Sequence, residues 1–172
     1  AERYRALLEK ADGKTKEDVT EFVLMKQKIK KFPTGLENFF INLRSIWIFK
    51  CELEIISKED LKPFPQLAEL HLIGNKIKEL PSDLFIFTPK IQTLNLSDNQ
   101  IKSIRINCFY PLKIVKSIDL TGNEIVNRKA KDPQEVLTLK MELLLTECVK
   151  FVEGVVKRLE NMKVKFELLN EV

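Results

Sequence analysis

One apolar pattern recurs five times at a spacing of 24 residues, and this period limits the fold more than any other feature of the chain. Each copy has apolar residues at positions 1, 4, 6 and 11, and position 9 favours Asn. A repeat of this length is one supersecondary unit that cannot bury its apolar side alone. We therefore expect successive units to stack as the coils of a solenoid and to share one continuous core. The copies begin at Val19, Leu43, Leu67, Ile91 and Val115.

The pattern also predicts which side chains face inward. Alternate side chains of a strand point to opposite faces, so we expect positions 4 and 6 in the core and positions 3, 5 and 7 on the inner curved surface. The Asn at position 9 lies where the chain turns away from the strand, and its amide can satisfy backbone groups of adjacent coils. Gln27 and Cys51 stand at this position in the first two repeats. We expect a less regular Asn ladder there, with Cys51 acting as a buried small hydrophobic residue.

The clearest copy of the pattern runs from Leu67 to Phe85 and reads LxxLxLxxNxIxxLPxxxF. This motif resembles the 24-residue class of leucine-rich repeats, which is found mostly in secreted proteins and receptor ectodomains. The resemblance implies an α/β fold, namely a leucine-rich-repeat solenoid of five repeats with parallel strands on its concave face.

Two shorter stretches, residues 13–19 and Cys51–Ile56, resemble secreted leucine-rich-repeat proteins of insects, particularly flies and mosquitoes. Some of those proteins join the repeats to a C-terminal coiled coil, dimerise and act in haemolymph immunity by holding complement-like proteins. This resemblance implies a secreted, extracellular protein whose signal peptide has been removed. The chain differs from the immune members in having few repeats and in lacking their cysteine clusters.

The repeat pattern divides the chain into three parts. Residues 1–18 place apolar side chains at helical spacing and are expected to form an N-terminal cap over the open end of the solenoid. Residues 19–127 hold the five repeats. Residues 128–172 form a long C-terminal helical segment, in which Asp132 is expected to cap the helix and Pro133 to occupy its first turn.

Apolar residues of the C-terminal segment recur mostly at alternating steps of four and three residues, which is the spacing of a coiled coil. A straight helix of this length runs roughly 55 Å, whereas five stacked strands span only about 24 Å. The helix must therefore project beyond the solenoid, or break near Gly154 or Asn161 and fold back. We favour first turns that cap the last repeat and a remainder that pairs with a helix of another chain, as a homo- or heterodimer. The seam consists of Leu137, Met141, Leu144, Cys148, Val152, Val155, Leu159, Met162, Phe166 and Leu169.

The chain has three cysteines, so at most one internal disulfide can form. A Cys108–Cys148 disulfide would fix the C-terminal helix to the solenoid. A Cys148–Cys148 disulfide would instead join two chains. Three free thiols are the remaining alternative.

Composition and motifs argue against catalysis and against nucleic-acid binding. The net charge of +4 is small, and the basic residues are interleaved with acidic ones. No apolar run approaches the ~18 residues of a membrane span. His71 lies at position 5 of a strand, without a nucleophile placed to form a catalytic set, and no cluster has metal-ligand spacing. We expect no enzyme activity, no metal and no cofactor.

The inner curved surface is apolar over the first three coils and polar over the last two. A contiguous exposed apolar patch marks an interaction site, and Trp, Phe and Met are enriched in the desolvated centres of interfaces. We expect a protein partner to bind around Trp47 and Phe49. The alternative is that residues 1–12 or the C-terminal helix cover the patch internally. The expected partner-binding residues are Val23, Met25, Lys26, Trp47, Phe49, Lys50, His71 and Ile73.

Asn95 begins an Asn-Leu-Ser glycosylation sequon on the polar half of the same surface, although the repeat consensus also produces these letters. The sequence as a whole indicates a non-catalytic secreted recognition protein that acts in innate immunity or host interaction. We expect protein partners, no nucleic acid and no membrane span. Two alternatives are an intracellular scaffold or adaptor, which free thiols would suit, and a carrier that holds a small hydrophobic ligand between the apolar patch and the tail.

Overall fold

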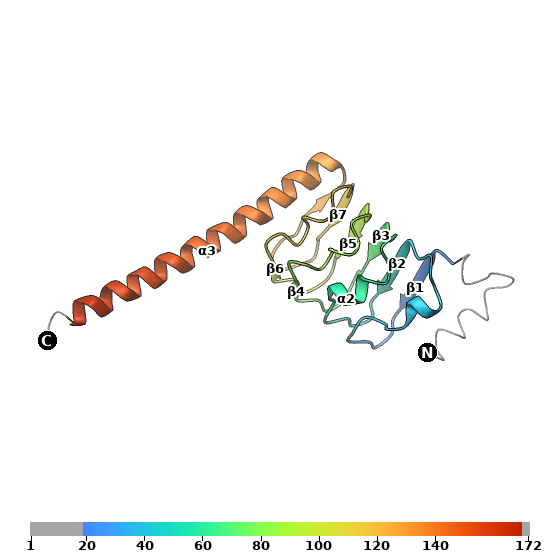
Figure 1. Cartoon of the computed structure of the whole chain (residues 1–172), viewed down its shortest axis with the longest axis horizontal. Helices are drawn as coiled ribbons and strands as arrows, with labels where there is room; N and C mark the ends of the chain where they lie inside the picture. Colours follow the sequence, from blue (N-terminus) through green and yellow to red (C-terminus); the bar gives the residue numbers. More distant parts are fainter. Residues whose placement is uncertain (1–18, 170–172) are drawn as a thin grey trace.

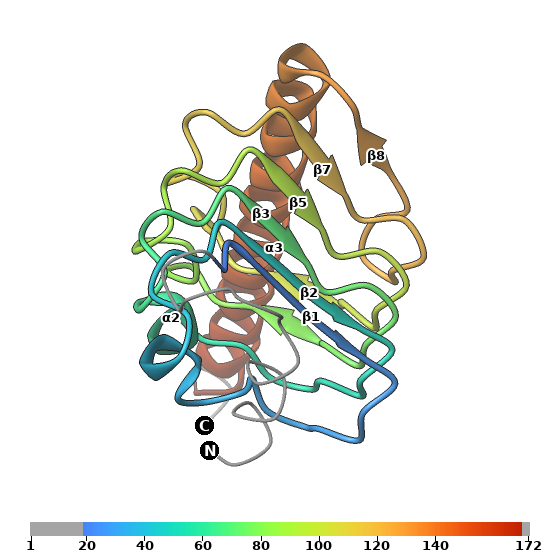
Figure 2. The ribbon, with the colours of Figure 1, turned by 90° about the vertical axis from the view of Figure 1, so that its right-hand side faces the viewer.

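The computed structural model describes residues 19–169, with side chains described as far as Met162. Five parallel strands lie side by side in one sheet (Figure 2). Each strand pairs with the next in a register of 24 residues, so that Phe22 lies opposite Ile46, and Ile46 opposite Leu70. This arrangement confirms the solenoid that the period predicted. The strands are β1 (Glu21–Met25), β2 (Ser45–Phe49), β3 (Glu69–His71), β5 (Thr93–Asn95) and β7 (Ser117–Asp119).

The return segments form the convex side and contain short elements. These are η1 (Leu36–Asn38), α2 (Lys58–Leu61), β4 (Glu79–Leu80) and β6 (Ser103–Ile104). Strands β4 and β6 pair in parallel as a second small sheet. The fifth repeat departs from the expected coil, because β8 (Lys129–Ala130) turns back and pairs antiparallel with β7. The described chain therefore makes four complete turns and adds a fifth strand whose return segment is replaced by β8 and the helix that follows.

The core lies between the concave sheet and the convex segments. Strand positions 4 and 6 point into it as expected: Leu70, Leu94 and Ile118 are fully buried. Phenylalanines from the convex segments close the other side, where Phe85 and Phe109 stack with ring centroids 6.0 Å apart. Burial of apolar area at about 25 cal/mol per Å² is the main force that holds the coils together.

The Asn ladder joins neighbouring coils by hydrogen bonds. Asn75 Oδ1 accepts from the backbone N–H groups of Cys51 (3.0 Å) and Leu53 (3.1 Å), and Asn75 Nδ2 donates to the carbonyl of Ile48 (2.8 Å). Asn99 and Asn123 make the same kinds of bond in the next two coils. Each Asn thereby satisfies buried backbone groups that the tight turn leaves without strand partners.

Cys51 takes the ladder position in the second repeat and is fully buried, as predicted. Its thiol donates a 3.4 Å hydrogen bond to the carbonyl of Leu24, which is 27 residues earlier. Asn75 reaches Ile48 across the same interval of 27 residues. A thiol therefore reproduces the donor half of the Asn interaction, but it is a weak acceptor and cannot replace the other half.

The C-terminal helix, α3 (Pro133–Leu169), is a single uninterrupted element of 37 residues. Its start follows the prediction, because Asp132 Oδ1 accepts a 2.9 Å hydrogen bond from the backbone N–H of Glu135. The first turns contact β7 and β8, and the remainder projects well beyond the solenoid (Figure 1). The helix does not break at Gly154 or Asn161. The N-terminal cap predicted for residues 1–18 lies outside the described residues.

Candidate functional site

A row of side chains at position 5 crosses the concave face from strand to strand. The sheet register places Val23 beside Trp47, and Trp47 beside His71. Asn95 and Asp119 continue the row on β5 and β7. These five residues lie side by side because the 24-residue period keeps equivalent residues of successive strands in register.

Trp47 is held in one orientation at the centre of the apolar half. Its ring stacks on the imidazole of His71, with centroids 3.5 Å apart and planes 9° from parallel. Its Nε1–H donates a 2.8 Å hydrogen bond to Ser45 Oγ, and that hydroxyl donates in turn to Glu69 Oε2 at 3.4 Å. An aromatic side chain that is already fixed loses little conformational entropy when a partner covers it.

His71 differs from its expected role as an exposed contact residue. It faces the concave side, but Trp47 covers it and leaves the residue only 7% exposed. Burial lowers the pKa of His71, and the nearby carboxylate of Glu69, with Oε2 3.6 Å from Nε2, opposes that shift. Neither ring nitrogen has a hydrogen-bond partner in the described part of the chain. The imidazole is therefore neutral at physiological pH and serves as a platform for the indole.

The exposed part of the apolar patch is narrower than the sequence suggests. Val23 is 48% and Met25 49% exposed, whereas Trp47, Phe49 and Ile73 are half-buried by neighbouring side chains. Two exposed lysines border this patch. Lys26 follows β1, and the Lys50 ammonium lies 5.1 Å from the Phe49 ring centroid, within cation–π range.

The polar half of the concave face satisfies its own hydrogen bonds. Asp119 accepts from the Thr121 hydroxyl at 2.7 Å and pairs with Lys129 at 2.8 Å. Although burial opposes it, these donors hold the pKa of Asp119 below its usual value. Asn95 Oδ1 accepts a 3.0 Å bond from the Ser97 backbone, and the side chain is half-buried within β5. Glycosylation of Asn95 stays a prediction.

The first turns of α3 contact β7 and β8 at the last-repeat end of the solenoid, and the helix then projects away from β2, the strand that carries Trp47 (Figure 1). The described part of this helix thus leaves the apolar patch open. The other segment expected to cover it, residues 1–12, lies outside the described residues.

The coiled-coil seam predicted on α3 is exposed to solvent throughout its described length. Leu144 is 37%, Val155 38%, and Val152, Leu159 and Met162 57–59% exposed. The residues that dock α3 onto the solenoid are different ones: Val136 and Leu139 are buried and Leu143 packs against the core. Phe166 lies on the described helix, but its side chain is outside the description.

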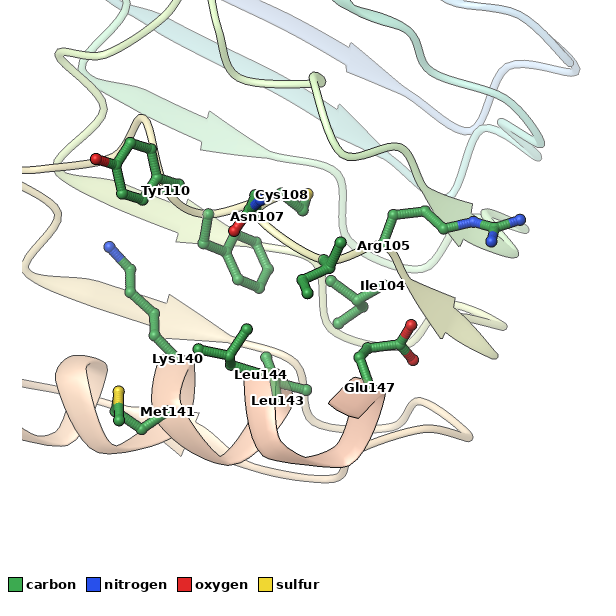
Figure 3. Close-up of a pocket in the computed structure, with 12 residues that line it drawn as sticks. Ile104, Arg105, Asn107, Cys108, Tyr110, Lys140, Met141, Leu143, Leu144 and Glu147 are labelled. Atoms are coloured by element: carbon green, nitrogen blue, oxygen red, sulfur yellow. The ribbon is translucent and has the colours of Figure 1, made fainter. Parts of the chain in front are cut away.

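The three thiols are free. Cys108 is buried beneath the convex loop of the fourth repeat and Cys148 is exposed on α3, so the internal disulfide between them is not formed. The reason is the orientation of the helix, which turns Leu143 and Glu147 rather than Cys148 toward that loop (Figure 3). Burial also raises the pKa of Cys108 well above its usual value, so this thiol stays protonated.

One cleft was missed in the sequence. It lies between α3 and the convex loop at residues 104–110, and its volume is about 190 Å³ (Figure 3). Ile104 and Phe109 occupy apolar positions of the repeat, but the other lining residues fall outside the pattern or lie on the helix. The period therefore carries no information about their meeting. The signal in the sequence was weak: Ile106 and Tyr110 are apolar residues outside the repeat positions, and in the structure they line the cleft and are 46% and 68% exposed.

Within residues 19–169, no group of three or more His, Cys, Asp or Glu side chains is placed to hold a metal ion. Among the described helices, none is both long and apolar enough to cross a membrane.

Comparisons with known proteins support the fold. Residues 65–125 match the family model described as leucine rich repeat. Phospholipase A2 inhibitor beta of Elaphe climacophora is 38% identical over 69 residues, which are 40% of this chain and 20% of that protein. A phospholipase A2 inhibitor of Gloydius brevicaudus siniticus is 39% identical over the same length and the same shares. The chain thus spans about a fifth of the length of these curated relatives.

A solved structure has a similar fold. The Toll–Spatzle complex, a molecular hub in Drosophila development and innate immunity, contains a chain that matches with a TM-score of 0.58 at 21% identity. The match covers 63% of this chain and 14% of that one. At this identity the likeness concerns the fold alone, and together with the family match it establishes a leucine-rich-repeat solenoid.

Proposed function

We propose that this chain is a non-catalytic, secreted recognition module that binds a protein partner through the apolar half of its concave face. The observation that carries the proposal is the fixed indole of Trp47, which is flanked by the exposed side chains of Val23 and Met25. Leucine-rich-repeat proteins bind other proteins, as the phospholipase A2 inhibitors and the Toll–Spatzle complex illustrate by name. A patch of this composition matches the centres of known interfaces.

Secretion and a role in immunity or host interaction are the finer parts of the proposal. They are supported by the likeness to inhibitors of a phospholipase and to a complex of innate immunity. Lys26 and Lys50 border the patch and would orient a partner that carries acidic residues at its rim. The exposed seam of α3 would join a second chain, so that the protein presents two patches.

Substitution of Trp47 tests the concave site directly. Trp47→Ala is expected to weaken partner binding by about 2 kcal/mol or more, because a central aromatic residue dominates such interfaces. The measurement is a pull-down from the native fluid with wild-type and variant protein, followed by titration of the captured partner. Met25→Glu should weaken binding as well without loss of stability, since its side chain is 49% exposed.

The matched control is Asn95→Ala, which removes a side chain from the same row two strands away. It should leave the affinity unchanged. If Trp47→Ala lowered the melting temperature and left the affinity intact, Trp47 would be internal core and the binding site would lie elsewhere.

A further inference from the structure

The cleft between α3 and the fourth repeat has an apolar interior and charged ends. Its walls come from Ile104, Phe109 and Leu143, with Met141 and Leu144 at the helical edge (Figure 3). Cys108 also lines this space, and its buried thiol is protonated, so it belongs to the apolar wall and does not act as a nucleophile. Polar side chains of the lining are few: Asn107 lies on the loop wall, and the charged groups of Lys140, Arg105 and Glu147 lie towards the ends.

One end of the cleft carries two positive charges with no acidic counterpart. Lys140 lines the cleft and its Nζ donates a 2.6 Å hydrogen bond to the carbonyl of Leu112. The Lys113 ammonium lies 3.4 Å from the centroid of Tyr110, another lining residue. Burial, and then repulsion from Lys113, lower the pKa of Lys140. In the part of the chain that the structure describes, neither lysine forms an ion pair with a carboxylate.

The charges at the other end are already compensated. Arg105 pairs with Glu79 at 2.6 Å, and Glu147 pairs with Lys150 at 3.2 Å. An anion would therefore be drawn to the lysine end alone, where it would relieve the repulsion between Lys140 and Lys113. Charge complementarity of this kind would place the negatively charged end of a bound molecule at the two lysines.

The size of the cleft limits the occupant further. Its volume of about 190 Å³ is smaller than the roughly 300–1,000 Å³ of sites for drug-sized ligands. A single alkyl chain suits a cleft of this volume better than a ring system or a lipid with two acyl chains.

We propose that this cleft binds a single-chain amphiphile with a carboxylate head, of the fatty-acid type. The chain lies between Phe109 and Leu143, and the carboxylate meets the ammonium groups of Lys140 and Lys113. The site is separate from the concave patch, so its test stands independently of the protein-binding proposal.

The test uses cis-parinarate, a fluorescent single-chain fatty acid without rings, as a probe with the full chain, and dodecanoate as a competitor. The wild type should bind the probe and release it to dodecanoate. Lys140→Met should weaken binding of the carboxylate about tenfold, the effect expected for loss of one charge-assisted hydrogen bond. Lys140→Arg should retain most of the affinity. Lys116→Met, which removes an exposed lysine of the same loop, should have no effect.

Competition with dodecanol separates the role of the head from that of the chain. Dodecanol should displace the probe more weakly than dodecanoate from the wild type, and about equally well from Lys140→Met. Leu144→Trp should fill the helical edge of the cleft and prevent binding. Val149→Glu, on the opposite side of α3, should not, which distinguishes the cleft from unspecific adsorption on the exposed seam.

A photoreactive diazirine derivative of dodecanoate locates the site by mass spectrometry. Labelling of peptides that contain residues 104–110 or 140–147 is expected. Absence of probe binding, equal affinities for Lys140→Met and Lys116→Met, or labelling confined to the concave strands would overturn the proposal.

Discussion

The chain has a single histidine, so the change in folding stability between pH 7 and 5.5 reports on His71. Burial under Trp47 lowers the pKa of His71 in the folded state, whereas the unfolded chain binds a proton at the ordinary value of about 6.5. As pH falls below about 6.5, the unfolded state therefore takes up a proton that the folded state refuses. The free energy of unfolding should decrease as pH falls from 7 towards 5.5, because it declines wherever the unfolded state binds more protons.

Urea denaturation at several pH values measures this slope. The shifted carboxyl groups, such as Asp83 and Asp119, have pKa values below their ordinary ones and contribute only at lower pH. His71→Phe retains an aromatic platform for Trp47 and should remove the slope between pH 7 and 5.5. A slope of the same size in this variant would contradict the assignment.

The Asn ladder predicts an unequal response at two equivalent positions. Asn99→Ala should lower the free energy of unfolding by about 3 kcal/mol, because it leaves the buried N–H of Ile77 and the carbonyl of Leu72 without partners. Cys51→Ala removes a weak thiol donor that the carbonyls of Leu24 and Phe49 share, and it should cost about 1 kcal/mol. Exposed Gln100 is the control, since Gln100→Ala should change little. Equal losses at Asn99 and Cys51 would show that the ladder contributes packing alone.

At the scale of elements, α3 is a helix with two different apolar faces. Leu139 is fully buried against the solenoid, whereas Leu145, on another face, is 60% exposed. Leu139→Ala should cost about 2–4 kcal/mol of unfolding free energy, because it leaves a cavity in the contact. Leu145→Ala should have almost no effect in the monomer. Chemical denaturation of both variants at low protein concentration measures the difference, and equal values would mean that α3 does not dock through this face.

The sequence predicted the start of α3 and favoured its projection, but it left a break near Gly154 or Asn161 open and did not reveal the docking face. The steps of four and three residues select the longest apolar stripe, and that stripe is the exposed one. Among the described side chains of α3, the apolar ones that pack into or against the core are Val136, Leu139 and Leu143. Three apolar docking positions over two turns do not form a recognisable stripe beside the ten positions of the seam. The surface of β7 and β8 that they contact also exists only after folding.

At the scale of the whole molecule, repetition explains both what the sequence reveals and what it hides. The period fixes the register, so the row from Val23 to Asp119 could be read without a structure. It does not fix how far one side chain covers the next, and the stack of Trp47 on His71 was therefore missed. The closing of the fifth repeat by β8 was missed too, because the repeat pattern continues as far as Ile125 before the chain turns back.

Exposure of the α3 seam bears on the assembly of the entire protein. In the single chain, the seam leaves apolar side chains in water. Val152, Leu159 and Met162 are each 57–59% exposed. The heptad-like spacing of the seam suits a partner helix, whose contact would remove this area from water. Because α3 docks on the solenoid through other residues, such a partner can bind without releasing the helix.

Leu159→Glu combined with Met162→Glu should therefore abolish self-association while the solenoid stays folded. Both side chains lie beyond the turns that contact β7 and β8, so circular dichroism and the melting temperature at low concentration should be unchanged. Sedimentation equilibrium should give a wild-type mass that rises with concentration and a variant mass near 20.1 kDa. A wild type that sediments as a monomer at every concentration would exclude a second copy as the partner and leave the seam for a helix of a different protein.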